Sequence, residues 1–166
     1  MPIESFAKMH CSIARPMSVL GERWTVLVLR ELFMGRRRFD VIQSDLGIAS
    51  NVLSERLATL MDEGIAERRP YGDRPDRFEY RLTEKGLDLQ PVLLELMRWG
   101  DRHMPVKGGP IHTLTHKDCG HEFEPAQTCS HCGGEVHARN VIRRFGPGAT
   151  KAQRRAEAKA LQESAA

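Results

Sequence analysis

The chain lacks the features that mark several classes of protein. Its longest uninterrupted apolar run is four residues, Val26 to Leu29, so the sequence predicts no segment that spans a bilayer. The N-terminal stretch Met1–Ser12 has no apolar h-region, so we expect no secretory signal and a cytoplasmic protein. The sequence contains no glycine-rich phosphate loop, no nucleophile elbow and no carboxylate pair on a common face. It therefore predicts no enzyme.

The chain also has little excess of charge of either sign, and it has few cysteines. Lys and Arg number 25 against 22 Asp and Glu, and a net charge of +3 excludes a histone-like polycation. Contact with nucleic acid must then be argued from the placement of charge. Four cysteines in a reducing compartment are not typical of a disulfide framework. With 166 residues, of which 40% are hydrophobic and 28% charged, the composition indicates one globular domain with a small appendage.

Apolar spacing in the first hundred residues predicts short helices followed by a β-hairpin. Gly47 is expected to end the third helix, and Ser50 to cap the fourth. A long helix should follow from Thr83 to Gly100, kinked or divided by Pro91. The expected helices and then the two strands are residues 13–20, 24–32, 39–46, 50–63, 65–71 and 78–82.

Composition divides the chain into four parts. The expected core of the first part is formed by Trp24, Leu27, Phe39, Leu53, Leu57, Phe78 and Leu96. A tail with seven alanines among its last 18 residues has little apolar surface to bury, so we expect no more than transient helix there and mobility in isolation. The parts are a helical domain with a hairpin (1–104), a linker (105–110), a cysteine- and histidine-containing module (111–145) and an Ala/Arg-rich tail (146–166).

A helix, a turn containing Gly47, a second helix and a charged hairpin together form the order of a winged helix-turn-helix. In such a unit the free face of the second helix enters the major groove, where Asn can bond adenine and Ser can bond bases or phosphate. Nearby arginines can contact phosphates. The candidate DNA-binding residues are Ser50, Asn51, Ser54 and Arg56 in the helix, and Arg36, Arg37, Arg74 and Arg77 around it.

An ordinary solvated surface is the alternative interpretation of the same residues. Soluble helices commonly have a polar outer face, and residues 30–81 are neutral, with ten Lys and Arg against ten Asp and Glu. Glu55 could accept a bond from cytosine, but an acid at such a position more often orders an arginine. Arg68 and Arg69 are more typical of a solvated or ion-paired strand face than of a DNA contact.

Several sequence runs resemble the HxlR-type winged helix-turn-helix transcriptional regulators. The resemblance covers roughly residues 10–100 in register. It rests on Cys11, on the runs Leu20–Thr25 and Leu29–Leu32, on Arg38–Phe39, Leu53–Leu57, Glu63–Ile65, Phe78–Gly86 and Trp99–Gly100.

The resemblance implies a bacterial-type homodimer that binds operator DNA and usually represses. It also implies dimer contacts from the terminal helices, here Cys11–Leu20 and Leu87–Trp99. At the hairpin tip Arg77 matches the family pattern, whereas Asp76 departs from it and could weaken phosphate contact. In some family members the cysteine near the N-terminus is a thiol switch. Cys11 is therefore a candidate redox switch, with packing at the dimer interface as the alternative.

The spacing His116-x2-Cys119-x9-Cys129-x2-Cys132 is typical of two metal knuckles. Glycine after Cys119 and after Cys132 lets the backbone fold under an ion, and one His with three thiolates forms a closed tetrahedral site of the structural zinc type. The sequence predicts one structural Zn²⁺ per chain in a zinc-ribbon-like module. His121 and His131 are alternatives for the nitrogen ligand, and unligated cysteines are the alternative to a metal site.

Two functions from different classes follow. The first is a homodimeric, sequence-specific, double-stranded DNA-binding transcriptional regulator, most often a repressor. The second is a module whose ribbon and tail bind a protein or RNA, with the winged helix serving for dimerisation. Sequence-selective binding of duplex DNA at physiological salt discriminates between them, because the second predicts only weak, salt-labile binding.

Overall fold

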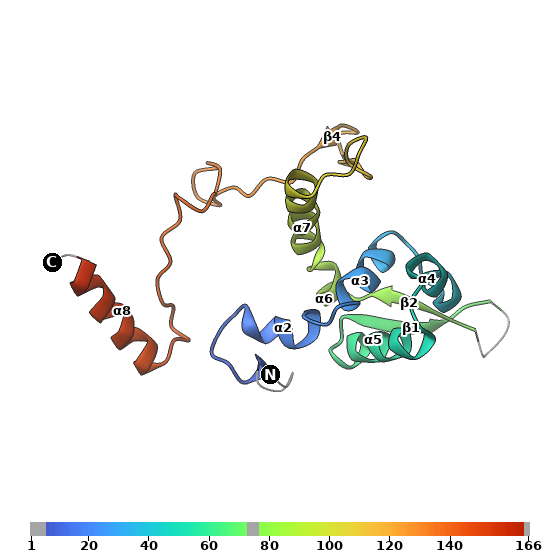
Figure 1. The fold of residues 1–166 in the computed structure, drawn as a ribbon, viewed down its shortest axis with the longest axis horizontal. Coiled ribbons are helices and arrows are strands. Elements are labelled where there is room, and N and C mark those ends of the chain that lie inside the picture. Colours follow the sequence, from blue (N-terminus) through green and yellow to red (C-terminus); the bar gives the residue numbers. More distant parts are fainter. Residues whose placement is uncertain (1–5, 73–76, 165–166) are drawn as a thin grey trace.

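The computed structural model describes residues 6–72 and 77–164 (Figure 1). Among the elements whose bounds lie within these residues, four helices precede a two-stranded hairpin, and two further helices, a small second hairpin and a C-terminal helix follow. These elements are α2 (Ala14–Leu20), α3 (Thr25–Phe33), α4 (Phe39–Leu46), α5 (Ser50–Asp62), β1 (Ala66–Pro70), β2 (Phe78–Leu82), α6 (Glu84–Leu87), α7 (Gln90–His103), β3 (Leu114–Thr115), β4 (Glu122–Phe123) and α8 (Lys151–Ser164). No helix in the described ranges is long and apolar enough to cross a membrane.

The core lies where α3, α4 and α5 meet the hairpin. Its fully buried apolar side chains come mainly from α3 and α5, because each of these helices places leucine or valine at helical spacing on one face. Trp24 and Phe39 pack partly buried against this cluster, as predicted. The most deeply buried apolar residues are Val28, Leu29, Ile42, Leu53, Leu57 and Leu60.

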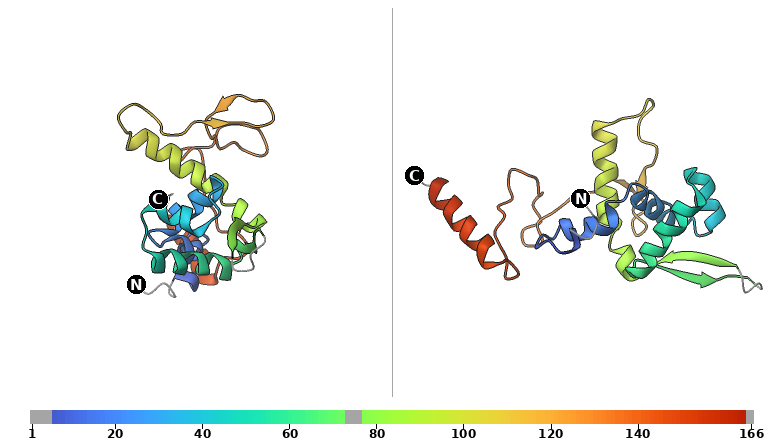
Figure 2. Two further views of the ribbon diagram at one scale, coloured as in Figure 1. Left: turned by 90° about the vertical axis from the view of Figure 1, so that its right-hand side faces the viewer. Right: turned by 60° about the horizontal axis from the view of Figure 1, so that its bottom comes forward.

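Three predicted core residues lie outside the core cluster, and one of them is Leu27, which is half-buried. Leu96 is 53% exposed, because α7 leaves the body of the domain rather than packing across it (Figure 2). Phe78 is half-buried outside the core cluster, and the Arg68 guanidinium carbon lies 4.1 Å from the centre of its ring. The alternating pattern of β2 is therefore correct only for Tyr80 and Leu82, which do pack against the core.

The turn between α4 and α5 follows the sequence closely. Gly47 has φ of 60°, a left-handed conformation that glycine adopts without steric cost, and its N–H bonds the Ser44 carbonyl. The cap of α5 differs from the prediction, since Ala49 occupies the cap position and Ser50 is the first helical residue. The Ser50 side chain is thereby left exposed instead of serving the helix end.

The hairpin is attached to the segment that precedes α4. β1 and β2 pair antiparallel in the register Ala66↔Leu82 to Pro70↔Phe78. The Tyr80 N–H donates to the Arg37 carbonyl at 2.7 Å, and Arg38 forms an isolated bridge with Glu79. These bonds fix the wing relative to the helix-turn-helix.

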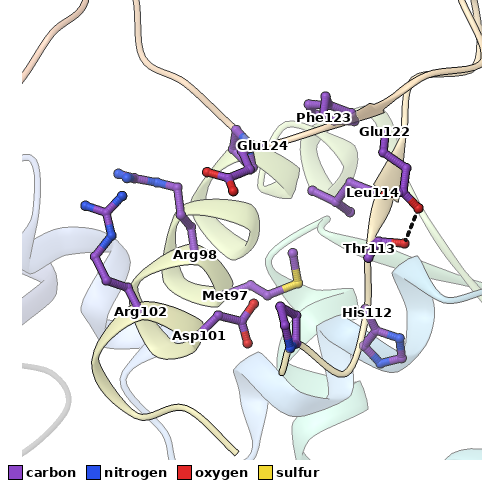
Figure 3. Close-up of a pocket in the computed structure, with 12 residues that line it drawn as sticks. Met97, Arg98, Asp101, Arg102, His112, Thr113, Leu114, Glu122, Phe123 and Glu124 are labelled. Carbon is purple, nitrogen blue, oxygen red and sulfur yellow. Dashed lines mark hydrogen bonds between the residues drawn. The ribbon is translucent and has the colours of Figure 1, made fainter. Parts of the chain in front are cut away.

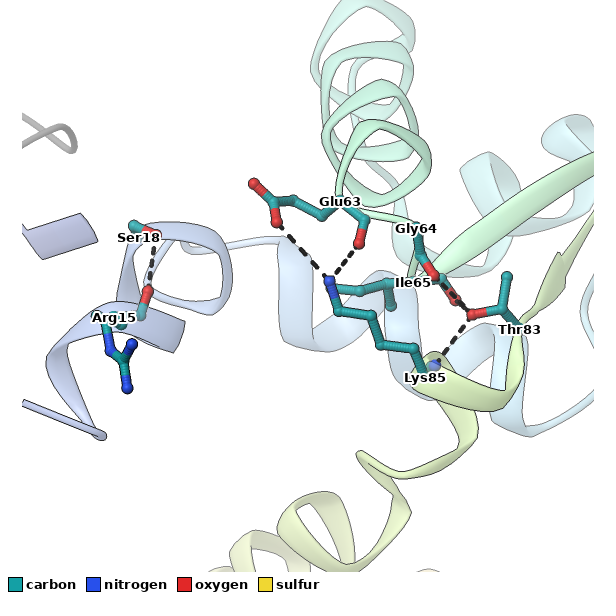
Figure 4. A network of polar contacts seen from close by, with 8 residues as sticks. Arg15, Ser18, Glu63, Gly64, Ile65, Thr83 and Lys85 are labelled. Atoms are coloured by element: carbon teal, nitrogen blue, oxygen red, sulfur yellow. Dashed lines mark hydrogen bonds and ion pairs between the residues drawn. The ribbon is translucent and has the colours of Figure 1, made fainter. Parts of the chain in front are cut away.

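The run that follows β2 is bonded to residues 63–65, which join α5 to β1 (Figure 4). Thr83 caps α6, as its oxygen accepts from the Gly86 N–H, and its hydroxyl donates to the Gly64 carbonyl at 2.7 Å. Lys85 donates to the Glu63 carbonyl. A Cβ on Gly86 would lie 2.1 Å from the Ile65 carbonyl oxygen, so no larger residue fits there. The sequence motif at 83–86 is therefore structural.

Pro91 divides the predicted long helix, because α6 ends at Leu87 and Pro91 occupies the first turn of α7. No residue of α7 is buried. The apolar side chains Val92, Leu96 and Trp99, spaced four and three residues apart, are 55%, 53% and 54% exposed. α7 thus presents an uncovered apolar stripe.

The chain beyond α7 has no core of its own. Among the residues after Met104 whose side chains are described, none is buried. Two small hairpins form there, β3–β4 and a second one around the bridge Thr128↔Glu135. In the tail, residues 151–164 form α8. Its mobility in isolation stays a prediction.

A capping box starts α8. The Gln153 N–H donates to the Thr150 hydroxyl, and the Thr150 N–H donates to the Gln153 side-chain oxygen.

Candidate nucleic-acid interface and candidate metal site

The outer face of α5 is built as a free polar surface. Leu53 and Leu57 hold the helix against the core with 0% and 1% exposure. Ser50, Asn51 and Ser54 are exposed on the remaining faces, and none of their side chains has a hydrogen-bond partner in the described part of the chain. The structure thus leaves these three predicted residues available to a ligand outside the chain.

Arg56 is not part of this exposed surface, which corrects the prediction that it lies at the shoulder of the free face. Its side chain is only 9% exposed, lies 3.5 Å from the Glu22 carboxylate and is paired with Glu55. The guanidinium therefore ties α5 to the start of α3. Glu55 pairs with this arginine, as the alternative to a contact with cytosine predicted.

The arginines around the helix-turn-helix fall into two groups. Arg36 is neutralised by Asp45, whose carboxylate lies 3.0 Å from its Nε. Arg37 and Arg77 are exposed and have no ion pair within residues 6–72 and 77–164. Arg74, the remaining predicted phosphate contact, lies outside the described residues.

The arginines on the wing are engaged with their neighbours. Arg69 pairs with Glu67 and Arg81 with Glu79, each at 2.5 Å. Arg77 stands opposite Tyr71 at the base of the tip, where the Tyr71 N–H donates to its carbonyl at 3.0 Å. Of the described wing arginines, Arg77 and Arg68 have no ion pair, and Arg68 lies over the Phe78 ring.

The predicted metal ligands form two pairs. In the first hairpin His116 Nδ1 lies 3.4 Å from Cys119 Sγ. In the second, Cys129 Sγ accepts the backbone N–H groups of Cys132 and His131 and contacts the Cys132 thiol, which lowers the pKa of Cys129. The structure brings each pair together but does not bring the pairs to each other: no group of three or more ligating side chains forms in the described ranges.

The turn that holds each pair has the expected backbone. Gly120 and Gly133 have φ of 72° and 71°, and their N–H groups bond the carbonyls of His116 and Cys129 at 2.8 Å. His121 pairs with His116 through its backbone carbonyl. The two loops therefore fold as separate tight turns, as knuckle spacing requires.

Cys11 lies three residues before the first residue of α2. It is exposed, and its sulfur accepts the Ala14 N–H at 3.4 Å. That bond, a second one from Ile13 and the charge of Arg15 lower the pKa of the Cys11 thiol. Sequence reasoning named this residue, but not the C-terminal segment that lies beside it.

Helices α4 and α5 joined at Gly47, with a hairpin fixed beside them, define a winged helix-turn-helix protein. The profile of the HxlR-like helix-turn-helix family matches residues 19–107, and the chain belongs to that family. It is accordingly a DNA-binding transcriptional regulator.

Proteins that are similar in sequence and in structure carry names of the same class. An uncharacterized HTH-type transcriptional regulator of Mycobacterium tuberculosis, Rv3095, is 47% identical over 82% of this chain and 87% of its own. The crystal structure of a candidate transcription factor, PA1607, superposes with a TM-score of 0.75 at 29% identity, covering 86% of this chain and 99% of that one. The reduced form of YodB from Bacillus subtilis superposes with a TM-score of 0.50 at 36% identity, covering 57% of this chain and 95% of that one.

Proposed function

We propose that the protein is a homodimer that binds operator DNA sequence-specifically and represses transcription. The observation that carries this proposal is the exposed polar face of α5, on which the Asn51 and Ser54 side chains have no partner among the described residues. We assign base contact to Ser50, Asn51 and Ser54, because α5 is the second helix of the helix-turn-helix. A repressor of this kind acts by occupying its operator, so its place is the cytoplasm, where bacterial DNA lies.

We assign phosphate contact to Arg37 and Arg77. Both are exposed, and neither has an acid to neutralise it among the described residues. Arg36 contributes less, because Asp45 already accepts from it. A phosphate contact adds affinity on any sequence and positions the protein, whereas a base contact adds affinity on the operator alone.

The dimer is proposed from the uncovered stripe of α7. Val92, Leu96 and Trp99 are each more than half exposed, and Met17 of α2 is exposed as well. Exposed apolar residues clustered on one helix are typical of a surface that a partner covers. A second copy of the chain would bury both helices and present two α5 helices to two half-sites about one DNA turn apart.

Operator binding tests the proposal. The operator is selected from random duplexes, and affinities are measured by fluorescence anisotropy over a range of salt concentrations. Asn51→Ala should cost about 1–3 kcal/mol on the operator and nothing on random duplex. Arg77→Ala should weaken both and lower the slope of log K against log salt by about one.

Arg69→Ala is the matched control on the same wing. Since Arg69 is paired with Glu67, its loss should change the salt slope by much less. Equal losses for Asn51→Ala on operator and random DNA would remove Asn51 from base readout. Weak, salt-labile binding without sequence preference would instead favour the protein- or RNA-interaction module.

Leu96→Glu tests the dimer separately. The charge should shift the mass measured by sedimentation from dimer to monomer, because it would be buried without a partner at the interface. Met34→Glu is the control, because this apolar side chain is 42% exposed at the end of α3, outside both proposed dimer stretches. A wild-type chain that sediments as a monomer bound to one half-site would overturn the homodimer.

We also propose one structural zinc ion per chain, held by His116, Cys119, Cys129 and Cys132. Two ligand pairs in tight turns, with backbone N–H groups donating to one sulfur, support the proposal, as does the absence of a buried side chain in the described residues after Met104. A segment this short without a core needs a staple. Residues 124–128 connect the hairpins, so binding would fold the second onto the first.

Metal analysis tests the zinc proposal on the full-length protein. We expect one zinc per chain, and Co²⁺ substitution should give the absorption bands of a tetrahedral thiolate site. Cys129→Ser should abolish them, and His137→Ala should not. Comparing His116→Ala with His121→Ala identifies the nitrogen ligand. Well under one zinc per chain, with residues 111–145 protected from proteolysis, would contradict the proposal.

A further inference from the structure

A cavity lies between the segment that leads into α2 and the segment that leads into α8. Its volume is about 760 Å³, within the range of small-molecule sites. One wall is formed by residues 7–13 with Arg15, and the other by residues 144–146, 148–149 and Gln153. Figure 2 shows the two segments side by side, although they are separated by most of the sequence.

Hydrogen bonds fix the second wall against the first. Gln153 Nε2 donates to the His10 carbonyl at 2.8 Å, while the other atom of the same amide completes the capping box with Thr150. Arg154 donates to the carbonyls of Gly146 and Pro147, both at 3.0 Å. The turn that bounds the cavity is therefore held by side chains of α8, and α8 is held by the N-terminal segment.

The lining of this cavity is cationic. Lys8, Arg15 and Arg144 contribute three positive charges, and none of the lining residues in the described part of the chain is Asp or Glu. None of the three has an ion pair there either. In a chain whose net charge is only +3, this is a local concentration of uncompensated charge.

A second cavity provides the comparison. The cleft of about 580 Å³ between α7 and β3–β4 is lined by Arg98 and Arg102, but also by Asp101, Glu122 and Glu124 (Figure 3). Arg98 is bonded to Glu95 at 2.7 Å as well. Because the lining of this cleft carries charges of both signs, it does not favour a ligand of one charge.

The cationic cavity also has an apolar lining. Met9, Ile13 and Phe145 line it and are 44%, 73% and 44% exposed. A ligand that fits both features carries one negative charge on an apolar body. A free inorganic anion would leave the apolar part empty, and a neutral hydrophobe would leave the cations uncompensated.

We propose that this cavity binds an organic anion with an aromatic or branched aliphatic body. Lys8, Arg15 and Arg144 face the acidic group, and the body lies against Met9, Ile13 and Phe145. The ligand bridges the two ends of the chain and stabilises their contact. This site is separate from the α5 surface and does not depend on DNA binding.

Two fluorescent probes that share a body test the charge requirement. 8-Anilinonaphthalene-1-sulfonate is an anion, and N-phenyl-1-naphthylamine is its neutral analogue. We expect the anion to bind the full-length protein about tenfold more tightly, since each exposed cation contributes about two- to fivefold. Bound anion should also slow alkylation of Cys11 by neutral iodoacetamide, measured by peptide mass spectrometry, because Cys11 lines the cavity.

Adjacent arginines provide the matched control. Arg144 lines the cavity and Arg143 does not. Arg144→Gln should weaken binding of the anion about two- to fivefold and leave the neutral probe unchanged, whereas Arg143→Gln should change neither.

Several outcomes would overturn the site. One is equal affinity of the two probes, and another is an equal effect of the two arginine variants. Fluorescence without protection of Cys11 would place the probe elsewhere, for example on the α7 stripe. Because both substitutions are on an exposed segment, neither is expected to unfold the domain.

Discussion

The helical domain and the chain beyond it are stabilised in different ways. In the first, leucines of α3 and α5 are fully buried, and hydrophobic burial determines the structure. In the second, the described residues bury no side chain, and order rests on backbone turns, one capping box and a few polar contacts between distant segments. We therefore expect single polar substitutions to change the stability of the first region little. The order of the second region should depend on bound ligands and helix caps.

The largest expected effect contrasts two leucines. Leu57→Ala should lower the free energy of unfolding by about 2–5 kcal/mol, because it opens a cavity in a core where Leu57 is 1% exposed. Leu114→Ala removes the same atoms from a half-buried site in β3. It should change the free energy of unfolding by less than about 0.5 kcal/mol. Urea denaturation followed by circular dichroism measures both, and equal losses would show that the two regions share one core.

Arg56 gives the next effect. Arg56→Ala should lower the free energy of unfolding by about 1–3 kcal/mol, because the buried stem and the bonds to Glu22 and Glu55 are lost. Arg77→Ala, an exposed arginine, should leave stability within about 0.5 kcal/mol. If Arg56→Ala instead leaves stability unchanged and weakens DNA binding, the sequence-based assignment of Arg56 to DNA is the correct one.

Thr150 tests the C-terminal region alone. Thr150→Ala removes half of the capping box and should destabilise α8 by about 1 kcal/mol, without moving the denaturation midpoint of the helical domain. Hydrogen exchange of residues 151–164 measures the local effect. Thr113→Ala, a threonine outside α8, is the control, and a change in the global midpoint for Thr150→Ala would show that α8 is part of the main folding unit.

The smallest effect concerns Cys11. The N–H groups of Ala14 and Ile13 and the charge of Arg15 favour the thiolate, so its pKa lies below the ordinary value. Alkylation should therefore be a few-fold faster at pH 7 in the folded than in the denatured chain. Because the pKa of Cys11 is lower in the folded chain than in the unfolded chain, the thiolate stabilises the folded state at pH values above the unfolded pKa. This stabilisation is lost as the pH falls through the folded pKa.

A substitution separates the two roles of Cys11. If Cys11 is a redox switch, oxidant should release wild-type protein from DNA and leave Cys11→Ser bound. Oxidant release that is unchanged in Cys11→Ser would leave packing as its role. Alkylation at equal rates in the folded and denatured chain would contradict the lowered pKa.

Local features were predictable from the sequence because they depend on neighbouring residues. Gly47 at the helix end, the Thr83 cap, the division at Pro91 and the two tight turns are of this kind. The capping box of α8 is local too, and the spacing of Thr150 and Gln153 would have revealed it. The composition of the tail, by contrast, reports on burial and not on caps.

The tertiary structure decided whatever depends on distant segments. Arg56 is paired because Glu22, in the turn between α2 and α3, lies beside it, and Arg36 is neutralised because α4 places Asp45 beside it. Leu96 is exposed because α7 leaves the domain. The cationic cavity exists because two ends of the chain meet. A sequence pattern fixes which face of a helix is apolar, but only packing determines what that face contacts and which charges are left unpaired.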